Sequence, residues 1–151
     1  MQNTDYDIRT LNGLIATTLD SADGYRAAAT DTDSHRFADM FRSRAGEREQ
    51  VVQQLHAEVS RLGGTPEEDG TLLASAHRAF LNLKAAITGN DDAAVVSTVE
   101  DGEDHIKAKY EAAMADEDVS PAVRALIQSA YQSVRAGHDQ MRDLKHSMAS
   151  N

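Results

Sequence analysis

Long stretches without a helix breaker constrain the fold of this chain most. Only two of its 151 residues are proline. Four long segments carry apolar residues three or four positions apart, which is the spacing of one face of an α-helix. No segment alternates between apolar and polar residues over a convincing length, so no β-sheet is expected. The sequence therefore predicts an all-α protein.

Five helices are predicted, separated by short breaks. The four long ones cover residues 5–29, 35–62, 92–115 and 121–151, and a shorter one covers residues 71–88. The breaks hold residues that begin and end helices. Two glycines and then Pro66 follow the second helix, while Ser120 and Pro121 supply the N-cap and first residue of the last one.

The lengths of the connections predict how the helices are arranged. Tight turns join the first long helix to the second and the third to the fourth, so each pair is expected to be antiparallel. The segment between the second and third long helices is too long for a tight turn, and an 18-residue helix within it would rise about 27 Å. We therefore expect one domain over residues 1–151, a ferritin-like four-helix bundle of two antiparallel hairpins joined by a long crossover that contains the extra short helix.

Composition and charge exclude several classes of function. The chain has no cysteine, so disulfides, thiol nucleophiles and thiolate metal sites are excluded, and any metal would need carboxylates and imidazoles. Its net charge of −10 argues against a nucleic-acid partner. The first residues show no leader pattern, and no apolar run approaches a membrane span of about 18 residues. We expect a soluble, cytoplasmic protein with no membrane partner.

Several blocks of the sequence, spread over nearly the whole chain, carry a family resemblance. They are "LNGLI" (11–15), "DGY" (23–25), "RLGGTPEEDG" (61–70), "HRAFLNLKAAITGNDD" (77–92), "EDGEDHIKAKYEAAM" (100–114) and "GHDQMRDLK" (137–145). Together they resemble a bacterial family of single-domain, ferritin-like four-helix-bundle proteins of unassigned function. The resemblance implies the fold and a bacterial origin more firmly than an activity.

The wider ferritin-like group includes di-iron proteins with a Glu on each of two helices and Glu-x-x-His on each of the other two. This sequence departs from that pattern on both of the latter helices. The second long helix offers Glu47-x-x-Gln50, and the last offers Arg135-x-x-His138, in which a guanidinium cannot be a ligand. If a metal site remains, it is a degenerate one.

Advancing 100° per residue from the apolar stripe of each helix identifies the polar residues that point inward. Glu49, Glu103 and His138 are predicted to do so at similar heights, and they form the candidate metal site for iron, manganese or zinc. Glu103 and His138 could instead make a buried, hydrogen-bonded ion pair without metal. The residues Tyr25, Tyr110 and Tyr131 lie on the same stripes and are expected to be core aromatics with satisfied hydroxyls.

Two functions follow from these observations. The first is a degenerate metal-binding, stress-related protein that holds one ion or a weak pair. The second is a metal-free structural or interaction bundle that self-associates to a homo-oligomer or binds a protein partner. No Ser–His–acid arrangement can be placed by spacing, so no catalytic residue is assigned and enzymatic activity stays open.

Overall fold

The computed structural model of this chain describes residues 4–31, 35–68 and 92–149. These residues form four helices and no strand: α1 (Thr4–Asp31), α2 (His35–Arg61), α4 (Asp92–Ala115) and α5 (Pro121–Ala149). The all-α prediction is confirmed, and the bounds of the long helices agree with the sequence pattern to within about two residues. The helix predicted over residues 71–88 lies outside the described residues.

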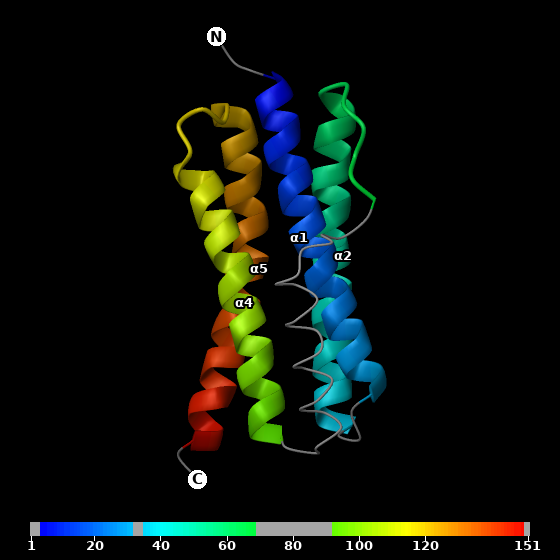
Figure 1. The fold of residues 1–151 in the computed structure, drawn as a ribbon, viewed down its shortest axis with the longest axis vertical. Helices are drawn as coiled ribbons and strands as arrows, with labels where there is room; N and C mark the ends of the chain where they lie inside the picture. The colour runs from blue at the N-terminus through cyan, green and yellow to red at the C-terminus, as the bar shows by residue number, and fades with distance from the viewer. Residues whose placement is uncertain (1–3, 32–34, 69–91, 150–151) are drawn as a thin grey trace.

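The four helices lie side by side as a bundle (Figure 1). Helices α1 and α5 run in one direction, and α2 and α4 run in the other. Each antiparallel pair, α1 with α2 and α4 with α5, is packed more closely within itself than against the other pair. The two pairs meet along α1–α4 and along α2–α5. In the described chain, no helix has the length and hydropathy that a membrane span requires.

The helix ends form where the sequence places its breakers. Gly63 takes a left-handed backbone conformation with a φ of 88°, and the N–H of Gly64 donates to the carbonyl of Val59 across the end of α2. At the start of α5, the backbone N–H of Ser120 donates to Asp7 Oδ1 at 2.9 Å. A side chain of α1 therefore caps the N-terminal end of α5.

The start of the connection after α2 is attached to α1 by one side chain. The Nδ2 atom of Asn12 donates to the carbonyl of Thr65 at 3.1 Å, and its Oδ1 atom accepts from the N–H of Glu67 at 2.8 Å. His56 Nε2 contacts the carbonyl of Glu67 at 2.7 Å. Residues 65–67 are therefore held along the outside of the first hairpin.

The buried apolar side chains form two separate clusters along the bundle axis. One cluster, towards the N-terminal end of α1, includes Leu11, Ile15, Val51, Leu55, Ile106, Tyr110, Ile127 and Val134. The other, towards the C-terminal end of α1, includes Tyr25, Ala28, Phe37, Phe41, Val96, Val99 and Met141. Polar residues lie at the level between the two clusters, and three of them, Thr18, Arg48 and Glu103, are at most 2% exposed. The candidate site is therefore a polar layer inside the core.

Candidate functional site

A buried ion pair joins the two hairpins at the centre of this layer. The Arg48 residue of α2 is 0% exposed and Glu103 of α4 is 2% exposed. The Nη2 atom of Arg48 donates to both carboxylate oxygens of Glu103, at 2.7 Å to Oε1 and 2.6 Å to Oε2. A charge-assisted contact of this kind offsets part of the cost of removing two charges from water.

Tyr25 adds a third hydrogen bond to the same carboxylate. Its hydroxyl on α1 donates to Glu103 Oε1 at 2.7 Å. Burial and then the neighbouring Glu103 charge raise the pKa of Tyr25 well above its ordinary value, so the hydroxyl keeps its proton at neutral pH. We call Tyr25, Arg48 and Glu103 the central network.

Helix α5 places a glycine, Gly137, beside the ion pair. A Cβ atom added at Gly137 of α5 would overlap the Nη2 atom of Arg48 and lie 3.0 Å from Glu103 Oε2. The backbone of α5 therefore approaches the ion pair as closely as a residue without a Cβ permits. Each of the four helices thus supplies one residue to this site.

A second buried chain of hydrogen bonds lies towards the apolar cluster that includes Leu11 and Tyr110. The hydroxyl of Thr18 donates to the carbonyl of Leu14 at 2.6 Å, and its oxygen is 2.7 Å from the hydroxyl oxygen of Tyr110. Burial raises the pKa of Tyr110 to about 12, although Thr18 and the positive charge of Arg48 oppose the shift. The prediction that the tyrosines are core aromatics with satisfied hydroxyls is confirmed for Tyr25 and Tyr110. Tyr131 is only partly buried, and its hydroxyl donates to Glu111 Oε2 at 3.0 Å.

The inward orientations predicted for Glu103 and His138 are confirmed, but their expected contact with each other is wrong. His138 is 9% exposed. Its Nε2 atom lies 2.6 Å from Asp104 Oδ1, and its Nδ1 atom lies 3.2 Å from Asp139 Oδ1. The hydrogen bond with His138 is the main cause that lowers the pKa of Asp139. His138 therefore pairs with two carboxylates near the surface, while the partner of Glu103 is Arg48.

The inward orientation predicted for Glu49 is also wrong. Its side chain is about half exposed and forms an ion pair with Arg26 of α1 on the outside of the first hairpin. Arg48, one residue earlier, faces the core instead, because successive residues on a helix point 100° apart. Among the described side chains of α2, nine are buried: Phe37, Ala38, Phe41, Ala45, Arg48, Val51, Val52, Leu55 and Val59.

A sequence signal for Arg48 does exist in this spacing. Six of the buried positions, Phe41, Ala45, Arg48, Val52, Leu55 and Val59, follow one another at intervals of four, three, four, three and four residues. Arg48 therefore occupies a regular position on one buried stripe of α2. The prediction missed it because an arginine was not considered as a core residue.

The residues of the candidate site do not fit a metal ion on Glu103. Both oxygens of this carboxylate accept from a guanidinium, whose positive charge would repel a cation placed beside it. Among residues 4–31, 35–68 and 92–149, no group of three or more His, Asp or Glu side chains is arranged to hold a metal. The role of Glu49, Glu103 and His138 as metal ligands stays a prediction that the structure does not support.

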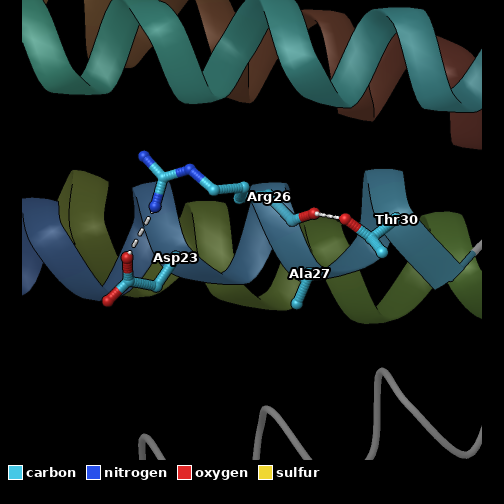
Figure 2. Close-up of a pocket in the computed structure, with 4 residues that line it drawn as sticks. All are labelled: Asp23, Arg26, Ala27 and Thr30. Carbon is cyan, nitrogen blue, oxygen red and sulfur yellow. Dashed lines mark hydrogen bonds and ion pairs between the residues drawn. The ribbon is translucent and has the colours of Figure 1, made fainter.

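The described surface also has a pocket on α1, which is open to solvent (Figure 2). It is lined by Asp23, Arg26, Ala27 and Thr30. The charged groups there are already paired, since Arg26 Nη1 lies 3.0 Å from Asp23 Oδ1 and its Nη2 atom contacts Glu49. The Thr30 hydroxyl donates to the carbonyl of Arg26 at 3.0 Å. The described lining thus presents no cluster of unpaired charged groups to a ligand.

Comparison with protein families finds a match over most of the chain. A family model described as Domain of unknown function (DUF2383) matches residues 7–116. The matched range contains Tyr25, Arg48 and Glu103, and it ends before α5 and Gly137. No curated protein matches the chain.

Proposed function

This chain belongs to the family described as Domain of unknown function (DUF2383), and because that description names no activity, we propose a function from the geometry of its own residues. The chain is a metal-independent helical bundle that acts as a structural or protein-interaction module. The observation that carries this proposal is the position of Arg48, a permanent cation inside the core whose Nη2 atom donates to both oxygens of Glu103.

Burial of the central network supports a structural role for it. The ionic groups of Arg48 and Glu103 are at most 2% exposed, so a substrate in solution does not reach them. A buried ion pair is a weak source of net stability, but it can specify one alignment of the helices, since any shift of α2 against α4 separates the charges. On this basis, contacts with other molecules are made by the surface of the bundle.

We also propose the ferritin-like connectivity for this bundle. Its support is the direction of the described helices, because α2 ends at one end of the bundle and α4 begins at the opposite end (Figure 1). A connection that runs back along the bundle would join these two ends, as in the ferritin-like arrangement. This proposal concerns the fold and adds no metal chemistry.

Metal analysis tests the proposal directly. Protein purified without an affinity metal or a chelator, and then soaked with Fe²⁺, Mn²⁺ or Zn²⁺, should retain far less than one metal ion per chain by elemental analysis. Its thermal midpoint should be the same with and without EDTA, since only a ligand that binds the native state raises stability. Near-stoichiometric metal that is lost in Glu103→Gln or His138→Ala would contradict metal independence and restore the degenerate metal site.

Light scattering tests the interaction part of the proposal. Coupled to size-exclusion chromatography over a range of protein concentrations, it should detect a defined oligomer if the bundle binds a second copy of itself. A strict monomer at all concentrations would contradict self-association and leave a different protein as the partner.

A further inference from the structure

The guanidinium of Arg48 has more hydrogen-bond donors than the described residues satisfy. An arginine side chain carries five N–H groups. Nη2 uses its two on Glu103, but Nε and Nη1 are buried and find no acceptor among the described residues. Buried donors without a partner are costly, and they are rare in native proteins unless water or an ion completes them.

The hydroxyl of Tyr110 is buried, and it lies near enough to Arg48 for the guanidinium charge to act on its pKa. The single proton of Thr18 is used on the carbonyl of Leu14, because a carbonyl oxygen can only accept. The 2.7 Å contact between the Thr18 and Tyr110 oxygens must therefore use the Tyr110 proton. The oxygen of Tyr110 is left with accepting capacity and no further donor among the described residues.

The hydroxyl oxygen of Tyr25, in the central network, also has unused accepting capacity. Its only proton is used on Glu103 Oε1, so its oxygen can only accept another hydrogen bond. The positive charge of Arg48 acts on both phenols, where it lowers a pKa that burial raises. Unused donors of Arg48 and unused acceptors of two phenols thus lie in one buried region.

These requirements select the chemistry of what can bind there. A bridging molecule must accept from a guanidinium N–H and donate to a phenol oxygen. A halide or a fully deprotonated anion can accept from Arg48 but has no proton for Tyr110, and a cation is repelled by the guanidinium. Water does both, and it is small enough for a packed core.

We propose that the polar layer of this bundle is an internal water-binding site, in which ordered water accepts from Nε or Nη1 of Arg48 and donates to the oxygen of Tyr110. The site lies between the two hairpins, which pack less closely against each other than the helices within each hairpin. The proposal does not depend on the surface function proposed above, because it concerns only groups in the core.

A crystal structure of the full chain at near-atomic resolution tests this site. Water should be found at hydrogen-bond distance, about 2.7–3.2 Å, from Nε or Nη1 of Arg48. In Tyr110→Phe this water should be lost or displaced, whereas the matched change Tyr131→Phe, at a partly buried tyrosine bonded to Glu111, should leave it in place. A dry site, or a direct bond from Arg48 to Tyr110, would overturn the proposal.

Two measurements on the unmodified protein decide the question even if Tyr110→Phe fails to fold. In a rotating-frame NMR experiment, the Nε–H of Arg48 should show a dipolar cross-peak to water that has the opposite sign to chemical exchange. Absence of that cross-peak would count against bound water. An anomalous peak beside Arg48 in a bromide-soaked crystal would show that an anion binds there, and it would overturn the assignment of the site to water.

Discussion

At the residue scale, the behaviour of the core depends on one charge pair and on the glycine beside it. Arg48 and Glu103 are each acceptable in the interior only because the other is present, since a lone buried charge is strongly unfavourable. Gly137 leaves the space that the guanidinium occupies. Substitution of any of these three residues should therefore lower the free energy of unfolding, whereas substitution of neighbours on the surface should change it little.

Breaking the ion pair on one side should destabilise the bundle strongly. Arg48→Met leaves the carboxylate of Glu103 buried without a cation, and we expect the free energy of unfolding to fall by about 3–5 kcal/mol. Arg48→Met combined with Glu103→Leu removes both charges and should be less destabilised than either single variant. Urea unfolding followed by circular dichroism measures all three.

Arg42→Met is the control for this cycle, since Arg42 and its partner Asp39 are both exposed. It should change the free energy of unfolding by less than about 1 kcal/mol. A double variant whose loss equals the sum of the two single losses would show that Arg48 and Glu103 are not coupled.

A methyl group at Gly137 should be harmful although alanine favours helices. Gly137→Ala places a Cβ against Arg48 Nη2 and Glu103 Oε2, and overpacking of this kind costs about 1–3 kcal/mol. Gly102→Ala lies on the exposed side of α4, where no atom of another described residue comes within 4 Å of the new Cβ, and it should instead stabilise by about 0.5–1 kcal/mol. Thermal unfolding compares the two, and equal effects would contradict the close approach of α5.

At the scale of the elements, side chains hold the ends of the helices across the bundle. Asp7 of α1 is 2% exposed and accepts from the N–H of Ser120, the residue before α5, and Asn12 of α1 holds the residues that follow α2. The Tyr6 hydroxyl also contacts Asp116 in the turn between α4 and α5. The contacts of Asp7 and Tyr6 therefore join α1 to the second hairpin near the N-terminal end of α1, away from the central network.

Removing the cap should loosen α5 from α1. Asp7→Ala leaves the N–H of Ser120 buried without an acceptor, which should lower the free energy of unfolding by about 1–2 kcal/mol. Amide hydrogen exchange should be faster in the first turn of α5 than in its middle. Asp5→Ala is the matched control, because it removes an exposed acidic residue from the same turn of α1 and should have a smaller effect.

At the scale of the whole molecule, two apolar clusters stabilise the bundle and the polar layer between them determines how they are aligned. The clusters alone would tolerate a shift of one hairpin along the other, since apolar contacts are not directional. Hydrogen bonds between Tyr25, Arg48 and Glu103 exist in one register only. The layer therefore contributes specificity more than net stability.

Alkaline pH should weaken the whole fold through Tyr110. Its pKa is about 12 in the native state and about 10 in the unfolded chain, so the native state binds more protons between these values. The corresponding stability is complete below pH 10 and is lost as the pH rises towards 12, by at most about 2–3 kcal/mol.

Urea unfolding at several pH values from 8 to about 11.5 measures this loss, within the range where Tyr110 titrates. The decline above pH 10 should be shallower in Tyr110→Phe than in the unmodified chain, since phenylalanine does not titrate. Equal slopes would contradict the assignment to Tyr110.

Much of this architecture could be predicted from the chain itself. Apolar spacing and breaker residues determine the four described helices and their ends, because both are local properties of the backbone. The same spacing correctly placed Glu103 and His138 inward. Facing towards the core depends only on the helix to which a residue belongs, so it is readable from one segment at a time.

Partner choice was decided by the tertiary structure alone. The pairing of Glu103 with Arg48 and the separate pairing of His138 with Asp104 depend on the rotation and height of each helix against the others. Helical periodicity specifies each helix alone, whereas contacts between helices arise only when all four are packed together.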